Sequence, residues 1–324
     1  MSDTIVVLVN GEVLAGGYES SINDQKSRAD DLARELLPIL ASNLNIAIMH
    51  GNKPQVGYVL FRSELASHVL HPIPLDVCGA DTQGATGYML CQSFLNELKR
   101  SKTQRYVMSV ITQTLVNSDS KFFVEFNKQI GPWLDQERAK QRSQVFGWQI
   151  VEEPGYGFRR VVSSPPPIEI IEMEGIKQLV ESGMIVITAG GGGIPVCINN
   201  NGIIEGVEAV VDTDHVACLL ARELNARIML MIVENDVKFI HSGLGTEVFH
   251  ELTLDELNRT IKESTIYSDM VRRKFQSAYE YLNSGGEQVV ITTLDNLSST
   301  LEKKSGLWIS VKNSTSDLYK LIQF

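Results

Sequence analysis

Three glycine corners, each directly after an apolar run, are the part of the sequence best suited to bind an anion. Gly190–Gly193 stand in a row in VITAGGGGIPV, and consecutive glycines let backbone N–H groups turn toward one anion. Gly11 follows the first apolar run of the chain, and Gly51 with Asn52 follows the second. One such corner alone is more often a flexible turn. Three of them favour an anion site, because ligands of open α/β sheets bind beyond the carboxyl ends of the strands.

The second corner, HGNKPQVG, also places a long charged side chain, Lys53, at its tip. This lysine either grips a phosphate or occupies the space that a ligand needs. Two common phosphate-binding motifs are absent from the sequence, because neither G-x-x-x-x-G-K-[ST] nor an early G-x-G-x-x-G occurs. The corners therefore predict an anion site that is neither a P-loop nor a dinucleotide fingerprint.

Strands and helices alternate along the chain and must position these corners. Helical periodicity appears in Asp24–Leu40 and Thr213–Leu224. Short apolar runs without polar alternation are typical of strands that are buried on both faces. They predict a mostly parallel sheet covered by helices, with strands at Ile5–Val9, Ile46–Met49, Tyr106–Ile111, Met184–Thr188, Ile228–Val233 and Gln288–Thr292. Residues 117–167 are polar and end in SSPPP, which favours an inserted subdomain.

The composition excludes several classes of protein. The 324 residues carry a net charge of -10, which argues against broad binding to nucleic acid or to anionic membranes. No apolar stretch approaches the ~20 residues that span a bilayer, and the N-terminus is a poor signal peptide. The four cysteines form no C-x-x-C pair. We therefore expect buried thiols in the cytoplasm and no protein-held metal site.

Six motifs, in chain order, carry a family resemblance: HGNKPQVG, PLDVCGADTQGATGYML, NKQIGPW, FRRVVSSPPP, AGGGGIPV and GVEAVVD. Together they resemble the carbamate kinases, which belong to the amino acid kinase superfamily. The match runs from about Ile5 to about Ser310. The resemblance implies a three-layer α/β/α sandwich around an open, mainly parallel sheet, and a homodimer.

The resemblance also implies an organisation of the chain. An amino acid kinase-like domain would cover residues 1–312, followed by a tail at 313–324. Residues 1–205 would form the substrate-side lobe, including a protruding subdomain at about 117–167, and residues 206–312 the nucleotide-side lobe.

The family moves a phosphoryl group between ATP and carbamate. It usually runs from carbamoyl phosphate and ADP toward ATP, in the breakdown of arginine or related nitrogen compounds. Such chemistry needs positioning and charge cancellation, which lysines, Mg²⁺ and backbone N–H groups supply without a nucleophilic side chain. The implied cofactors are thus ATP or ADP with Mg²⁺, the metal being carried largely by the phosphates.

Carried over position by position, the family motifs assign roles to particular residues. The catalytic positions are Lys128 in K-Q-I-G-P, Lys274 before the final Gly-Gly, and Asp212. The implied substrate-binding residues are Gly11, Gly51, Asn52, Gly191 and Gly192, and the nucleotide-binding residues are Gly190, Gly193, Asp214 and Asp236.

The sequence departs from the family pattern around the same site. Thr213 replaces a lysine, Glu12 and Lys53 replace small or neutral residues, and the segments 233–238 and 269–273 are rebuilt. Losing one such cation costs roughly 10²–10³ in rate. Three functions remain open: a divergent carbamate kinase, a kinase for another small acid, or a non-catalytic relative that serves as a regulator, sensor or assembly partner.

Glu12 and Lys53 lie in corners that face the same small substrate in the family. A lone charge in such a crevice is costly unless it has a partner. Because the two charges are opposite, we expect them to pair across the pocket. The pair would fill the volume where carbamate sits and weaken the activity.

Overall fold

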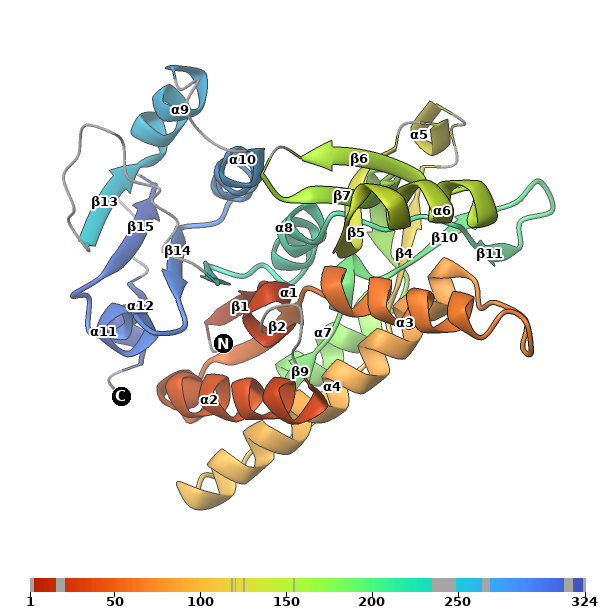
Figure 1. Ribbon diagram of the computed structural model, residues 1–324. Helices are drawn as coiled ribbons and strands as arrows, with labels where there is room; N and C mark the ends of the chain where they lie inside the picture. The colour runs from red at the N-terminus through yellow and green to blue at the C-terminus, as the bar shows by residue number, and fades with distance from the viewer. Residues whose placement is uncertain are drawn as a thin grey trace.

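The computed structural model describes residues 3–15, 21–117, 119, 121–124, 126–153, 155–234, 249–263, 269–311 and 317–322. Within these residues the centre of the fold is an eight-stranded sheet in the order β13-β15-β14-β12-β1-β2-β9-β3 (Figure 1). Among its described neighbours, only the β14–β15 pair is antiparallel. The strands are β1 (Thr4–Val9), β2 (Asn45–His50), β3 (Val107–Ser109), β9 (Ile185–Ile187), β12 (Ile228–Val233), β13 (Phe249–Thr253), β14 (Gln288–Thr293) and β15 (Gly306–Ser310).

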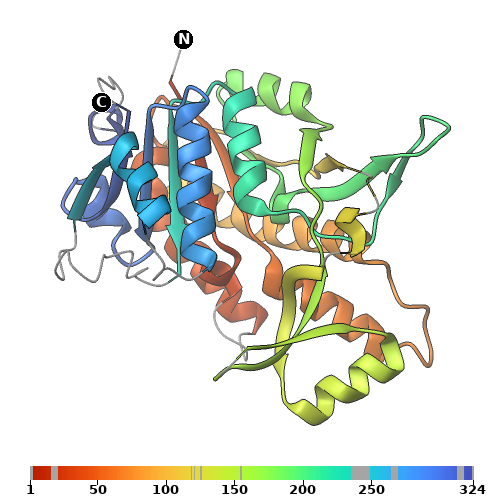
Figure 2. The same cartoon turned by 90° about the horizontal axis from the view of Figure 1, so that it is seen from above.

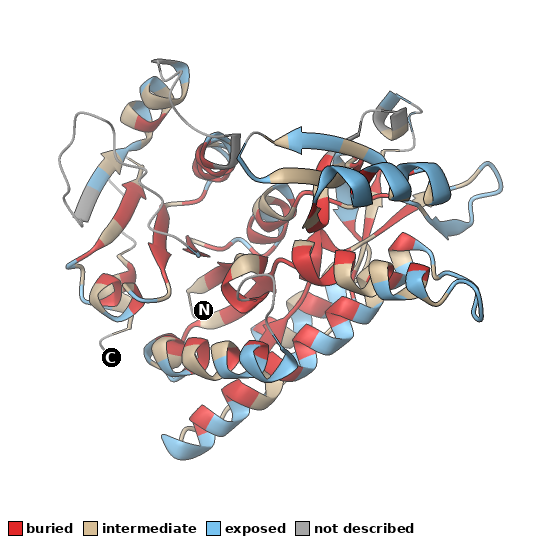
Figure 3. Ribbon diagram, in the orientation of Figure 1, coloured by how far each residue is buried: buried red, intermediate tan, exposed pale blue. Residues whose placement is uncertain are grey.

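Helices cover both faces of this sheet. Val6 and Leu8 of β1 pack into one hydrophobic core, and Ile5, Val7 and Val9 pack into the other. Figure 3 shows the buried residues concentrated between the layers. The first core is closed by α7 (Met173–Glu181), α8 (Thr213–Glu223), α9 (Leu254–Glu263) and α10 (Asp269–Asn283). The second is closed by α1 (Gly11–Ala15), α2 (Ile22–Leu40), α4 (Leu75–Arg100), α11 (Leu297–Leu301) and α12 (Leu318–Leu321).

The predicted fold class is confirmed, and a strand forms within each of the six predicted runs. The prediction that Tyr106–Ile111 is buried is wrong: only Val107–Ser109 forms a strand, β3, and it lies at the exposed edge of the sheet. Strands β1, β2, β9, β12 and β14 are almost entirely buried. Burial on both faces is the physical reason why their sequences are continuously apolar.

A second sheet, in the order β11-β10-β4-β8, is the base of a protruding unit. It contains β4 (Gln113–Val116), β8 (Pro167–Ile170), β10 (Ile194–Ile198) and β11 (Ile204–Gly206). The chain leaves at the end of β4 and returns at the start of β8, which pairs with β4 in antiparallel fashion. In between it builds a separate sheet, β5-β7-β6, which stands away from the main body in Figure 2. The elements are α5 (Lys121–Val124), β5 (Phe126–Leu134), α6 (Gln136–Phe146), β6 (Gln149–Glu153) and β7 (Gly157–Ser163).

The protruding sheet docks on α3 (Lys53–Leu65) through a contact that only glycines permit. A Cβ added to Gly57 of α3 would lie 1.9 Å from the Cα of Gly131 in β5. Helix backbone and strand backbone therefore touch, because neither residue has a side chain at this point. The contact fixes β5, and with it Lys128, relative to the start of α3.

A buried polar cluster holds the far end of α3 to the same sheet. Glu64 accepts hydrogen bonds from Arg160 Nη1 at 3.0 Å and from Trp148 Nε1 at 2.7 Å. Arg160 and Trp148 therefore have structural roles at this junction.

Helix α12 packs against the second core. Leu318 of α12 is fully buried in the second core, and its backbone N–H donates to Gln288 Oε1 at 2.9 Å. Among the described residues, no helix is both long enough and apolar enough to traverse a lipid bilayer.

Candidate functional site

A pocket lies where the carboxyl ends of β1 and β2 meet the first turn of α8 and strand β5. The space inside it that a water molecule can reach is small, about 20 Å³. This position agrees with the rule that open α/β sheets bind ligands beyond the carboxyl ends of their strands. The lining residues are Asn10, Gly11, Glu12, Gly51, Lys53, Lys128, Asp212, Thr213 and Asp214.

The corners after β1 and β2 touch each other backbone to backbone. A Cβ added to Gly51 would lie 2.6 Å from the backbone nitrogen of Gly11. Asn10 N donates to Ile232 O at 2.9 Å, and Gly51 N donates to Val9 O at 2.8 Å. The sheet pairing therefore continues into both corners, and glycine is required because no side chain fits between them.

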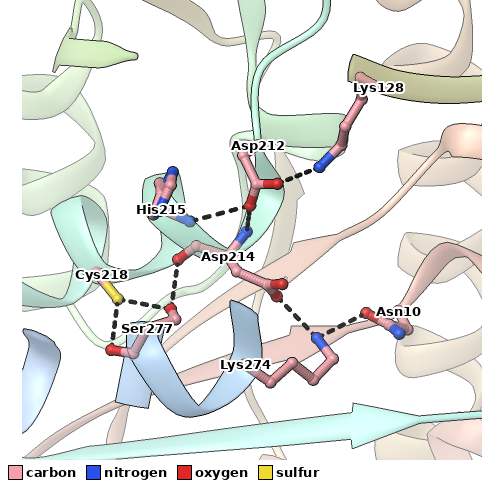
Figure 4. A network of polar contacts seen from close by, with 8 residues as sticks. All are labelled: Asn10, Lys128, Asp212, Asp214, His215, Cys218, Lys274 and Ser277. Carbon is pink, nitrogen blue, oxygen red and sulfur yellow. Dashed lines mark hydrogen bonds and ion pairs between the residues drawn. The ribbon is translucent and has the colours of Figure 1, made fainter. Parts of the chain in front are cut away.

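Asp212 caps α8 and reaches into the pocket at the same time. Its Oδ1 accepts the backbone N–H of Asp214 at 3.0 Å and of His215 at 3.4 Å, which is the usual role of an N-cap carboxylate. Its Oδ2 forms an ion pair with Lys128 Nζ (Figure 4). Burial opposes ionisation of Asp212, but the charge and hydrogen bond of Lys128 outweigh it and hold the pKa of Asp212 below its ordinary value.

Lys274 approaches the same turn of α8 from the other side (Figure 4). Its side chain is 2% exposed. Lys274 Nζ lies 2.8 Å from Asp214 Oδ1 and 3.2 Å from Asn10 Oδ1. Ser277, one turn further along α10, donates to the backbone oxygen of Asp214 at 2.9 Å. The two buried lysines are therefore each paired with one aspartate of a single helix turn.

The rebuilt segment 269–273 is the first turn of α10, so Lys274 projects from a regular helix. Arg272 is exposed, and neither Arg272 nor Arg273 is among the residues that line the pocket. They do not replace the missing cation there.

Lys53 stands at the start of α3 and is half-buried. Burial and the neighbouring Lys128 charge lower the pKa of Lys53 to about 8, against the opposing effects of Glu12, Asp212 and Asp214. The predicted direct pair with Glu12 is not formed: in the part of the chain that the structure describes, the two side chains make no ion pair, although both line the pocket. Glu12 acts on Lys53 only as a charge at a distance.

The four-glycine loop, Gly190–Gly193, packs against His50 and Asn52 and is not among the residues that line the pocket. A Cβ on Gly190 would lie 2.5 Å from His50 Nε2, and one on Gly191 would lie 2.2 Å from the Asn52 side chain. The N–H groups of Gly192 and Gly193 donate to Ala189 O and Gly190 O, at 3.0 and 3.1 Å. These two N–H groups are therefore occupied by protein, and the loop serves close packing at the end of β9.

Several predicted residues lie away from the pocket lining. Asn52 donates to Thr82 Oγ1 at 2.7 Å, and Gly190–Gly193 are not among the lining residues. Asp236 lies outside the described residues, as does most of the segment 233–238. The ligand-binding roles of these residues stay predictions.

His50, at the end of β2, stays neutral near pH 7. Burial lowers its pKa to about 4, although its Nδ1 is 3.2 Å from Gly51 O. A neutral imidazole whose Nδ1 donates to that carbonyl is a structural part of the corner.

Sequence reasoning missed Asn10 as a site residue. Asn10 lines the pocket and accepts a hydrogen bond from Lys274. The available signal was its position, one residue after β1 and next to Gly11, at the end of a central strand.

Comparisons with known proteins agree with this geometry. The family model described as "Amino acid kinase family" matches residues 16–293. The carbamate kinase of Pyrococcus horikoshii is 35% identical over 96% of this chain and 100% of its own length. The "Carbamate kinase-like protein YahI" of Escherichia coli is 34% identical over 95% of this chain and 99% of its own.

A solved structure extends the likeness to three dimensions. Carbamate kinase from Giardia lamblia bound to AMP-PNP has a TM-score of 0.83 with 28% sequence identity, covering 96% of this chain and 99% of that one. The family model, the relatives and the solved structure agree, and the chain belongs to the carbamate kinase family within the amino acid kinase superfamily.

Proposed function

We propose that the protein transfers a phosphoryl group reversibly between ATP and carbamate, so that carbamoyl phosphate and ADP give ATP and carbamate. One observation carries the proposal: Lys128 and Lys274 converge on one pocket at the carboxyl ends of the central strands, each paired with an aspartate of the α8 first turn. The relatives that share this fold at 34–35% identity are named as carbamate kinases or as carbamate kinase-like. No observation favours a regulator or a sensor.

The lysines would cancel the charge of the transferred group. Asp212 and Asp214 hold both ammonium groups in place before any ligand arrives. Such preorganised charges stabilise a transition state without reorganising during the reaction. Lys128 comes from the protruding sheet and Lys274 from the nucleotide-side lobe, so the two cations would approach the phosphoryl group from two sides.

The nucleotide would bind beside α8 and the end of β12, in the proposed nucleotide-side lobe of residues 206–312. We propose that Asp214, Asp236 and the loop Gly190–Gly193 contribute there. Among the described residues, no group of three or more His, Cys, Asp or Glu side chains is arranged to hold a metal ion. Mg²⁺ would therefore enter as part of the substrate, bound by the nucleotide phosphates.

We also propose a homodimer that works in the cytoplasm, in the breakdown of arginine or a related nitrogen compound. Support for the dimer comes from β3, an edge strand of the main sheet, and from the adjoining helix α4. The exposed apolar side chains here include Tyr88 and Leu95 of α4, Met108 of β3 and Tyr106 just before β3. A monomeric mass in light scattering at micromolar protein would contradict this assembly.

The decisive assay mixes purified protein with carbamoyl phosphate, ADP and Mg²⁺ and follows ATP. We expect ATP formation that depends on both substrates. In parallel, calorimetry with ADP and Mg²⁺ should give binding heat and a raised melting temperature. No ATP, with no heat and no thermal shift at millimolar nucleotide, would refute the proposed function.

A further inference from the structure

The pocket is lined by two opposite charges, Glu12 and Lys53, for which the described residues supply no direct partner. Lys128 and Lys274 each have a carboxylate partner. Glu12 and Lys53 line the same pocket, yet within the described residues neither takes part in a hydrogen bond or an ion pair. A charge in a partly enclosed pocket is poorly hydrated, so a ligand that supplies the missing partner gains affinity from it.

Glu12 lies near a second carboxylate, that of Glu234. Burial and the Glu12 charge raise the pKa of Glu234, which follows β12, although Arg28 of α2 counteracts them. The two carboxylates therefore lie close enough to repel each other. A ligand group that donates N–H bonds relieves this repulsion, whereas a ligand carboxylate would add to it.

Lys53 lies near a second cation, Lys128. Lys53 lies close enough to Lys128 for the two ammonium groups to repel each other, as the lowered pKa of Lys53 reflects. An anion beside Lys53 would relieve this repulsion. The pocket lining thus offers one small ligand both an N–H acceptor, Glu12, and a cation, Lys53.

We propose that the acid substrate carries an N–H donor close to its carboxylate, and that Glu12 accepts the N–H while Lys53 holds the carboxylate. This inference rests on the proposed function and adds the selection of the acid. Carbamate is the smallest such acid, and small amide or ureido acids share the pattern.

In the reaction the bond between ADP and the γ-phosphorus breaks, and a carboxylate oxygen forms the new bond to phosphorus. The N–H group is unchanged, so Glu12 selects and orients the acid.

A metal ion at Glu12 is the competing explanation. It is disfavoured because the described residues offer no group of three His, Cys, Asp or Glu side chains for a metal. The experiment below is therefore run in EDTA and without nucleotide. Selectivity that appears only when Mg²⁺ is added would overturn the inference.

The test uses oxamate and pyruvate, stable acids of nearly equal shape that differ by an amide NH₂ in place of a methyl group. Calorimetry on the full chain should show that oxamate binds more tightly by roughly 10- to 100-fold, the usual value of a hydrogen bond to a charged acceptor. Glu12→Met should reduce that ratio to near one. Lys53→Met should weaken both acids and leave the ratio unchanged. The matched control Glu35→Met, at another half-buried glutamate, should bind like the wild type.

The outcomes separate this inference from the proposed function. Binding of neither acid, equal binding of both, or an unchanged ratio in Glu12→Met each overturns the inference. If Glu12→Met fails to melt cooperatively, Glu12→Gln replaces it; removing the charge should then reduce the ratio at least several-fold, and an unchanged ratio again overturns the inference. The same samples are assayed with carbamoyl phosphate and ADP. Selective oxamate binding without ATP formation would refute the proposed function alone.

Discussion

Lys128 of the protruding sheet and Asp212 at the start of α8 form a buried ion pair, although they are 84 residues apart in the chain. The pair joins two parts of the fold across the candidate site. Each side chain is nearly inaccessible to solvent. Both charges are largely shielded from water, so the pair links folding to function.

Lys128→Ala is therefore expected to remove phosphotransfer and to destabilise the fold. Loss of a preorganised cation costs roughly 10²–10³ in turnover. Leaving Asp212 buried and unpaired costs about 3–5 kcal/mol. Turnover and urea unfolding measure the two effects. Lys140→Ala, at an exposed lysine of α6 in the same subdomain, is the control and should change neither. Wild-type turnover in Lys128→Ala would remove this lysine from the catalytic assignment.

Gly57→Ala should disrupt the docking of β5 on α3. The added methyl group would lie 1.9 Å from Gly131 Cα, which only a backbone movement relieves. We expect a lower free energy of unfolding and lower turnover, because Lys128 moves with β5. Gly84→Ala is the matched control: it lies in helix α4, and its added Cβ meets no atom within 4 Å. Alanine should stabilise that helix by roughly 0.5–1 kcal/mol. Equal melting temperatures for the two variants would contradict the docking argument.

Thr213→Lys should raise turnover if the missing cation limits the reaction. Thr213 lines the pocket between the two aspartates of the α8 turn. Restoring a cation there can recover up to roughly 10²–10³ in rate. Steady-state kinetics with carbamoyl phosphate and ADP provide the measurement. Ser182→Lys adds the same charge at an exposed position at the end of α7 and should leave turnover unchanged. If Thr213→Lys behaves like that control, the departure at Thr213 does not limit catalysis.

Lys53 gives a pH-dependent contribution to stability whose sign follows from its pKa. The folded-state pKa is about 8, below the ordinary 10.5. Between these values the unfolded chain binds the proton and the folded protein does not. Lys53 therefore increases the free energy of unfolding as pH rises through that window. Urea unfolding of wild type and Lys53→Met at about pH 7 and about pH 10 tests the sign. The free energy of unfolding of the wild type, relative to that of Lys53→Met, should be larger at the higher pH. If the difference between the two proteins stays constant or changes in the opposite direction, the lowered pKa of Lys53 is contradicted.

Local chemistry was sufficient to predict the layered fold from the sequence. Continuous apolar runs such as Ile228–Val233 predicted strands buried on both faces, and the periodicity of Asp24–Leu40 predicted a covering helix. Gly11 and Gly51 were predicted to allow close approach, which they do, but the atoms that approach are each other's backbones. The order of the family motifs also predicted that Lys128, Lys274 and the α8 aspartates are site residues.

The pairing of charges was decided by the tertiary structure, because pairing depends on distances between side chains from separate elements. The sequence placed Glu12 opposite Lys53, yet in the described part of the chain they form no ion pair, while Lys128 and Lys274 take the carboxylates of the α8 turn. Asn10 became a site residue only through its contact with Lys274, which is 264 positions away. Composition and spacing determine which elements form and which groups are available. Only the packing of α3, β5, α8 and α10 around the strand ends decides which of those groups meet.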